Sequence, residues 1–388
     1  TTGVQNTFVG GLAGDGTDDG DANVAVGYAT LSANCGDNNT AVGAGAMTGA
    51  TGSDNTFMGR SAGLALSAGI KNTAVGAFAL DRETSGSFTT AVGYQALTNQ
   101  IIPNGSVHNT AVGYNAAVSV STGTQNTIIG SQAGDAITDA DYNTVLGYSA
   151  LGSDTLGSRS VAIGRSTLSA QNFTTATNTN NTAVGYAAGP LVTTGYSLTF
   201  VGADAGGSHT TGAQCTFIGS ESGNFATSSD NSTFVGHEAG RGITNTKLTG
   251  NSNTAVGTFA GANLQGAAHS NTAIGKSTGG GITTGVENTC LGESAGDSIQ
   301  TGSNNIIIGH NADPNASDNT NAIVIGENIT GAPNDFTFGK ASNVVFNDFD
   351  TDAAWTRSSD ERLKKNITDQ TLGLDFINDL RTVKYKWK

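Results

Sequence analysis

The sequence predicts an all-β fold whose main part, residues 1–339, is a parallel β-solenoid (a β-roll) of about 19 coils. The first observation is a five-residue unit, Asn39-Thr40-Ala41-Val42-Gly43 in its commonest form, which returns from residues 6–10 to residues 322–326. The second is its spacing, because most of the closing glycines lie 16 or 17 residues apart. A short fixed period indicates a solenoid with one small unit per coil.

Each closing glycine marks one predicted coil, for which we expect two short strands and two turns. These glycines are Gly10, Gly27, Gly43, Gly59, Gly76, Gly93, Gly113, Gly130, Gly147, Gly164, Gly185, Gly202, Gly219, Gly236, Gly257, Gly275, Gly292, Gly309 and Gly326.

The residues before each glycine alternate in character as a strand does. The position directly before it is aliphatic, as in Val42, and the position two earlier is usually threonine, as in Thr40. We expect this strand face to hold the core aliphatics. The opposite face carries Ala or Phe and usually Asn, as in Ala41 and Asn39, and stacked Asn residues can form amide ladders. Neither face is charged, so we expect both to be buried, one of them against other copies of the chain.

Two positions of the unit exchange size. Phe217, two residues before a closing glycine, goes with Gly223, four residues after it, whereas Ala162 goes with Leu168. Three units, such as that of Ala273, break the trend. The exchange predicts that both positions share one core volume, because protein interiors pack at nearly constant density.

Composition and charge limit the partners. The chain has 388 residues with 56 glycines and four prolines, and the strict period excludes collagen. A net charge of −14 disfavours nucleic acid and anionic membranes as partners. No apolar run of about 18 residues predicts a membrane span. The three cysteines do not form a disulfide framework, and we expect Cys290 to be a small core residue.

Three steps between closing glycines are longer than the rest, with extra residues at 98–108, 169–180 and 241–252. These insertions recur after every four coils. One interpretation is the duplication of an ancestral four-coil block. The other is a row of projecting loops that contact a ligand, because insertions in solenoids gather on one face.

Asp204, Glu221 and Glu238 each lie two residues after a closing glycine in consecutive coils. They should therefore stack about 5 Å apart. The simplest interpretation is a solvated column of carboxylates. Two alternatives are a Ca²⁺ site, the one metal ion we consider, and a glycosidase pair at the separation of retaining enzymes. No other cofactor is expected.

The character of the chain changes after residue 339. Residues 340–358 are interpreted as a connector, and residues 359–388 as a small α+β segment with helical spacing followed by a strand. The tail contains Ser359-Asp360-Glu361-Arg362-Leu363-Lys364-Lys365 and, near its end, Tyr385-Lys386-Trp387. It resembles the start of the endosialidase-type intramolecular chaperone domain, which closes many bacteriophage tail fibres and tailspikes. Known members are longer, so the resemblance covers only the beginning of that domain.

This resemblance implies assembly into a homotrimer and one self-cleavage step. Carried over residue by residue, Ser359 is the nucleophile, Lys364 is its base, and the cut falls between Ser358 and Ser359. A Ser–Lys pair needs a neutral lysine and hence a lowered pKa. The alternative is that Ser359 caps a helix whose first turn carries Asp360 and Glu361.

The repeats, as in residues 181–187, resemble those found upstream of such chaperones. They are also similar to the head repeats of trimeric autotransporter adhesins, which form left-handed parallel β-roll trimers. The resulting prediction is a structural phage tail fibre shaft, on the virion tail and extracellular, that presents a surface for a host glycan or protein receptor. The alternatives are a bacterial surface adhesin or extracellular filament and a polysaccharide depolymerase. No enzyme activity is expected beyond the self-cleavage.

Overall fold

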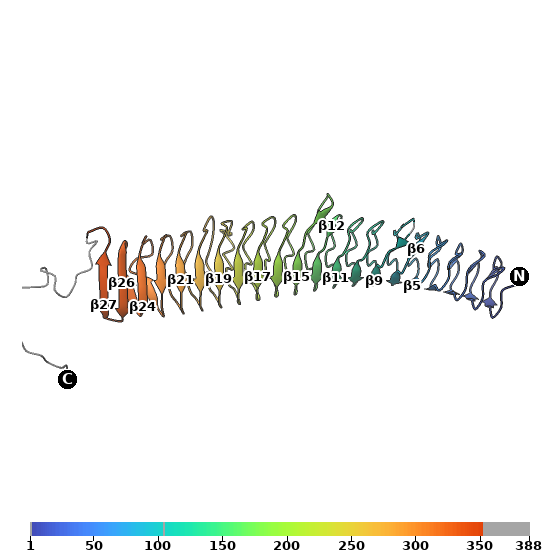
Figure 1. Ribbon diagram of the computed structural model, residues 1–388, viewed down its shortest axis with the longest axis horizontal. Coiled ribbons are helices and arrows are strands. Elements are labelled where there is room, and N and C mark those ends of the chain that lie inside the picture. The colour runs from blue at the N-terminus through green and yellow to red at the C-terminus, as the bar shows by residue number, and fades with distance from the viewer. Residues whose placement is uncertain (1, 104, 352–388) are drawn as a thin grey trace, which may run out of the picture. The chain divides into compact units, whose positions relative to one another are not determined.

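The computed structural model describes residues 2–103 and 105–351. The chain divides into two compact units, Thr1–Phe346 and Asn347–Lys388, and the division falls inside the segment interpreted as a connector. The regular elements of the described residues are β-strands. This part of the chain contains no helix long and apolar enough to cross a membrane. In the first unit the coils follow one another from the blue N-terminal end to the red strands β26 and β27 (Figure 1).

One sheet runs through the stacked coils, with parallel strands from β1 to β26, while the arrow of β27 points opposite to that of β26 in Figure 1. In the described residues it has 21 strands, and pairing is in register, with Thr7 opposite Val24 and Val9 opposite Val26. Its strands are β1 (Thr7–Val9), β2 (Val24–Val26), β3 (Thr40–Val42), β4 (Thr56–Met58), β5 (Thr73–Val75), β7 (Thr90–Val92), β9 (Thr110–Val112), β10 (Thr127–Ile129), β11 (Thr144–Leu146), β13 (Val161–Ile163), β15 (Thr182–Val184), β16 (Thr199–Val201), β17 (Thr216–Ile218), β18 (Thr233–Val235), β19 (Thr254–Val256), β20 (Thr272–Ile274), β21 (Thr289–Leu291), β22 (Ile306–Ile308), β24 (Ile323–Glu327), β26 (Asp335–Lys340) and β27 (Asn343–Asp348). The predicted parallel β-solenoid is confirmed.

The prediction of two strands per coil is wrong for most coils. Short second strands pair only as β6 (Gly86–Ser87) with β8 (Gly105–Ser106), β12 (Gly157–Ser158) with β14 (Thr177–Asn178), and β23 (Ala312–Pro314) with β25 (Ile329–Gly331) within the described ranges. Elsewhere that side of the coil consists of turns. Ser61 and Gly63 have φ values of 56° and 59°, a left-handed helical conformation that differs from the extended conformation of a strand. These turns still bond to the next coil, since Met47 N–H donates to the Ala62 carbonyl oxygen at 3.0 Å.

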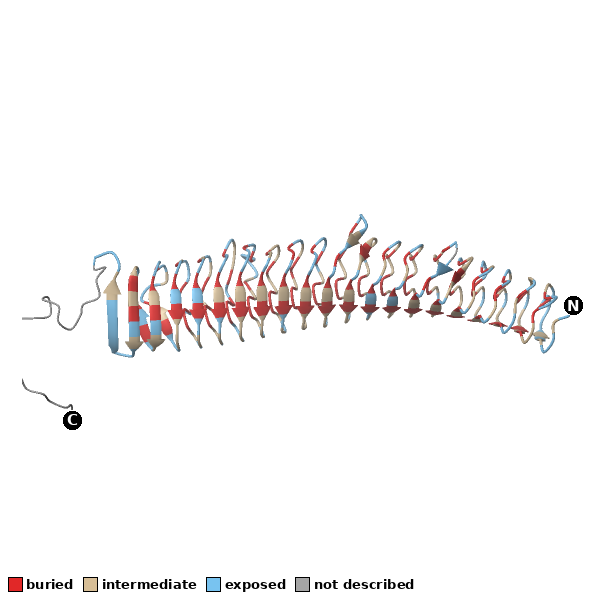
Figure 2. Cartoon of the chain, viewed as in Figure 1, coloured by how far each residue is buried: buried red, intermediate tan, exposed pale blue. Residues whose placement is uncertain are grey.

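The interior of the solenoid lies on the strand face that carries Ala, Phe and Asn. Ala41, Phe57 and Asn39 are fully buried. In Figure 2 the middle strands of the solenoid carry a buried band between residues of intermediate exposure. The opposite face points outward, since Val9 is 56% and Leu146 is 46% exposed in the single chain. The expectation that the threonine face holds the core aliphatics is therefore wrong. A thin coil encloses only one face of its strand, and the alternation of side chains leaves the other face outside.

The exchange of size between two positions of the unit is confirmed as a shared core volume. A β-carbon added at Gly223 would lie 2.6 Å from the ring of Phe217. The exceptions have a physical reason that the sequence did not suggest. At Gly279, which follows Ala273, the added atom would lie 3.0 Å from Cδ1 of Ile282, a residue that fills the space from a third position of the coil.

Asn side chains form the expected ladder through the interior. Asn126 N–H donates to Oδ1 of Asn109, and Asn143 N–H donates to Oδ1 of Asn126, each at 2.9 Å. The amide nitrogen of Asn126 donates across the interior to the carbonyl oxygen of Ala140 at 2.8 Å. Each of these side chains thus satisfies two backbone groups of the next coil that would otherwise be buried without partners.

Stacked aromatic rings report the spacing of the coils. The rings of Phe200 and Phe217, and those of Phe217 and Phe234, stack with centroids 4.8 Å apart. This is the distance between neighbouring strands of a sheet, so the interior side chains are in contact from coil to coil.

Exchange of residues within one coil tests the shared volume. We predict that Gly223→Leu destabilises the solenoid by about 1–3 kcal/mol, because the new side chain overlaps the Phe217 ring. The double variant Phe217→Ala/Gly223→Leu should recover most of this loss, since it reproduces the combination of Ala162 and Leu168. Denaturant unfolding of both chains provides the measurement. Equal losses in the single and double variants would contradict the shared volume.

Candidate functional site

The three carboxylates of the predicted column lie on one corner of the solenoid, just after the closing glycines. Asp204, Glu221 and Glu238 have φ values of 55°, 57° and 55°, so this corner places successive side chains in the same way. All three residues are half-buried. The predicted alignment of the column is therefore reproduced by the backbone.

The charges of this column are not equivalent. Glu238 forms an ion pair with Arg241, in which Oε2 and Nη1 lie 2.7 Å apart. Its Oε1 lies 3.7 Å from Nε2 of His237. Partial burial, and next the neighbouring charge of Glu221, raise the pKa of Asp204. In residues 2–103 and 105–351 no group of three or more His, Cys, Asp or Glu side chains has the arrangement of a metal site. The structure therefore gives the Ca²⁺ hypothesis no support.

Two of the insertions form short parallel strand pairs at one corner of the coil. Strand β8 of the first insertion pairs with β6, and strand β14 of the second pairs with β12. The labels β6 and β12 lie along the same edge of the solenoid in Figure 1. The third insertion contributes isolated bridges at Leu248, which pairs with Ala226 and Gly266. The insertions are thus anchored to the coils beside them.

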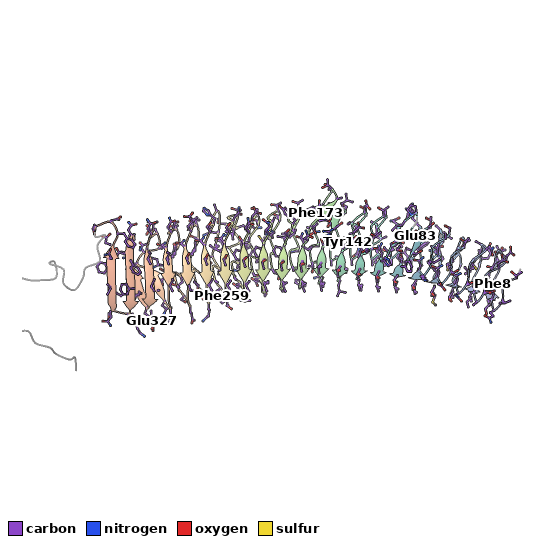
Figure 3. All side chains as sticks on the ribbon, in the orientation of Figure 1. Phe8, Glu83, Tyr142, Phe173, Phe259 and Glu327 are labelled. Atoms are coloured by element: carbon purple, nitrogen blue, oxygen red, sulfur yellow. The ribbon has the colours of Figure 1, made fainter. Side chains whose placement is uncertain are left out.

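A buried polar cluster holds the first insertion in place. Glu83, which is labelled in Figure 3, is fully buried. Its Oε1 accepts a hydrogen bond from the N–H of Gly86 at 2.7 Å. Its Oε2 accepts one from the side-chain amide of Gln100 at 2.9 Å. Gln100 also contacts Thr89 Oγ1, at 3.2 Å, and accepts a hydrogen bond from the side chain of Asn109. Thr89 occupies a position that is usually Asn. The side-chain amide of Gln100 therefore continues the Asn ladder in this coil by bonding to Thr89 and Asn109.

The second insertion repeats the same arrangement. Oδ1 of the buried Asp154 accepts a hydrogen bond from the N–H of Phe173 at 3.0 Å, and Oδ2 accepts one from the side-chain amide of Gln171. Gln171 also donates to Ser160 Oγ at 3.0 Å and accepts from Asn181 at 2.8 Å. The recurrence of this cluster supports the interpretation of the insertions as products of a block duplication.

Sequence reasoning missed these interior polar residues. Glu83, Gln100, Asp154 and Gln171 each lie seven residues after a closing glycine, a position that usually carries an aliphatic residue such as Ile282. His209 holds the same position, fully buried against the rings of Phe200 and Phe217. Its ring nitrogens contact the carbonyl oxygens of Ala226 and Gly212 at 2.9 and 3.0 Å. Burial lowers the pKa of this histidine. The sequence signal that could have identified these residues is a polar side chain at the position seven residues after a closing glycine, where other coils carry an aliphatic residue.

The position directly after the closing glycine is exposed in most coils and often carries tyrosine. Tyr28 is 64% exposed, and the rings of Tyr94 and Tyr114 stack with centroids 5.6 Å apart. Cys290 is buried as expected, and burial raises its thiol pKa to about 12.

Comparison with protein families identifies the C-terminal segment. Residues 359–388 match the family model described as the chaperone of endosialidase. The match confirms the resemblance noted for this segment and covers only a small part of the chain. No curated protein matches the chain. Ser358, Ser359, Lys364 and the predicted α+β segment lie outside the residues that the structure describes.

The buried clusters can be tested at the second insertion. We predict that Gln171→Leu destabilises the solenoid by about 1.5–3 kcal/mol, because Asp154 then loses a buried hydrogen bond and the Asn ladder is interrupted. The control is Gln300→Leu, which changes an exposed glutamine in the same way. Unfolding by denaturant measures both variants. An equal, small effect of the two substitutions would show that the cluster does not hold the insertion.

Proposed function

We propose that the chain is the shaft region of a homotrimeric bacteriophage tail fibre, an extracellular structural protein of the virion tail. The observation that carries the proposal is the outer face of the long sheet. From β1 to β22 its outward positions are threonines and aliphatic residues, with no charged side chain among them. The match of residues 359–388 to the chaperone family supports the same function.

The outer face requires a partner on physical grounds. Ile218, Ile274 and Leu291 remain 38–45% exposed in the single chain, and equivalent residues continue along the sheet. Monomeric soluble proteins rarely expose a continuous apolar patch larger than a few hundred Å². Copies of the same chain present the same regular stripe, so a symmetric bundle of parallel solenoids covers the stripe along its full length.

The proposed role of the C-terminal segment follows from the family. Assembly brings three chaperone segments together, and Ser359 Oγ then attacks the carbonyl carbon of Ser358 while Lys364 takes the hydroxyl proton. The Ser358–Ser359 amide bond breaks as its nitrogen leaves with a proton from Lys364, and water then hydrolyses the ester that links Ser358 to Ser359 Oγ. Burial during assembly favours the neutral amine of the lysine. Cleavage would therefore follow correct trimer formation.

The insertions and the exposed corners form the surface that would meet a host glycan or protein receptor. They lie outside the strands of the long sheet, so they stay accessible when its outer face is covered. A depolymerase is disfavoured, because Glu238 of the carboxylate column is already paired with Arg241.

The outer face predicts the assembly state. Light scattering of the purified chain should give three times the mass of one chain. We expect Val256→Lys to abolish this assembly, because it places a charge on the covered face, whereas Thr258→Lys, at the exposed corner of the same coil, should leave it unchanged. A stable folded monomer at micromolar concentration would contradict the trimer, and long filaments would favour the extracellular filament.

The self-cleavage is tested in a chain extended to a complete chaperone domain. Mass spectrometry should detect a fragment that ends at Ser358. Ser359→Ala and Lys364→Ala should each leave the extended chain intact, since one removes the nucleophile and the other removes its base. A Ser359→Ala chain that is still cut at this bond would exclude the proposed mechanism.

A further inference from the structure

A cleft opens beside the third insertion and is built differently from the rest of the solenoid. It has a volume of about 460 Å³ and is lined by Glu221, Phe225, Arg241, Ile243, Thr244 and Asn245. The first two residues come from the coil of β17, and the others come from the insertion that follows β18.

The third insertion lacks the interior cluster that anchors the other two. The positions equivalent to Asp154 and Gln171 are Ala226 and Ile243. Ile243 is only half-buried and lines the cleft, while Leu248, five residues later, is fully buried beside Ala226. The residues between Ile243 and Leu248 are therefore displaced to the outside of the coil, where they form one wall of the cleft.

A glycine permits this displacement. Gly242 has a φ of +75°, and a β-carbon there would lie 3.2 Å from Cβ of Phe225. The insertion thus turns outward in close contact with Phe225 and leaves the aromatic residue in the floor of the cleft.

The polar groups of the cleft favour a ligand that both donates and accepts hydrogen bonds. Nη1 of Arg241 is paired with Glu238, which neutralises the charge of the arginine, while its buried Nε has no hydrogen-bond partner among the described residues. The carboxylate of Glu221 forms no hydrogen bond or ion pair with the described residues of the chain. Glu221 is therefore a free acceptor, half-buried beside the apolar side chains of Phe225 and Ile243, and Asn245 offers both a donor and an acceptor.

These features distinguish among classes of ligand. An anionic sugar would meet the uncompensated charge of Glu221 in a chain whose net charge is −14, so it is disfavoured. A divalent cation would find too few oxygen ligands, since calcium takes six to eight. A neutral sugar ring has hydroxyl donors for the carboxylate and an apolar face for the Phe225 side of the cleft, and the volume lies within the range of small-molecule sites.

We propose that this cleft binds one neutral saccharide unit of a surface glycan. The proposal rests on the proposed function as a receptor-binding fibre and assigns that function to a site and a ligand class. The cleft residues lie outside the strands of the long sheet, so the site remains open when the outer face is covered.

The test uses the full chain on an array of oligosaccharides built from glucose, galactose and N-acetylglucosamine, beside sialylated and uronic acid oligosaccharides. We expect binding to neutral members of the array. Glu221→Gln and Phe225→Ala should each weaken that binding by about tenfold, since one reduces the charge of the acceptor and the other removes the apolar floor. Asn245→Ala, on the exposed insertion, should weaken it without affecting the fold.

Matched controls are Glu293→Gln and Tyr28→Ala, which make the same kinds of change at exposed sites remote from the cleft. Binding that is equal in the cleft variants and the controls would overturn the cleft while leaving a receptor-binding fibre in place. A preference for sialylated or uronic acid members would overturn the neutral ligand. Absence of binding to every saccharide would overturn the cleft as a saccharide site. The receptor-binding function would then require a protein receptor. Adsorption of the chain to bacterial cells tests that alternative.

Discussion

The close approach of consecutive coils at the closing glycine is the constraint on which the rest of the solenoid depends. At Gly236 the backbone has a φ of +134°, and a β-carbon there would lie 2.6 Å from the carbonyl oxygen of Gly257 in the next coil. Any other residue would have to push the coils apart and break the hydrogen bonds between them. Because the same approach recurs at each closing glycine, it fixes both the register of the sheet and the direction in which each coil turns.

A fixed backbone leaves side-chain volume as the main variable inside the coil. Three positions of the coil share the interior, and one of them carries the large side chain. Phe217 is large where Gly223 is small, and Leu168 is large where Ala162 is small. Where the first two positions are both small, as at Ala273 and Gly279, Ile282 at the third position fills the space. The same third position accepts a buried glutamate or aspartate only where a glutamine of the next coil satisfies it. The first two insertions therefore begin at places where the interior changes from apolar packing to a hydrogen-bonded cluster.

The proposed functions of the solenoid follow from its separate surfaces. The outer sheet face is regular, uncharged and suited to contact with identical copies, while the corners vary from coil to coil. The third insertion departs furthest from the regular pattern, since Leu248 replaces Ile243 in the interior and the displaced residues enclose a cleft. Variation outside a constant backbone is the usual way in which a repeat protein acquires a specific site.

The sequence by itself determined the parallel solenoid, the number and length of its coils, the Asn ladder and the shared volume of Phe217 and Gly223, because each depends on a local pattern that the period repeats. It also identified the chaperone-like segment from a short motif. Only the tertiary structure decided which strand face is enclosed, since Thr40 and Val42 are as free of charge as Ala41, and burial depends on the direction in which the coil closes. The clusters of Glu83 and Asp154 and the cleft at Ile243 likewise required the structure, because their partners come from other coils or insertions and no local pattern specifies those contacts.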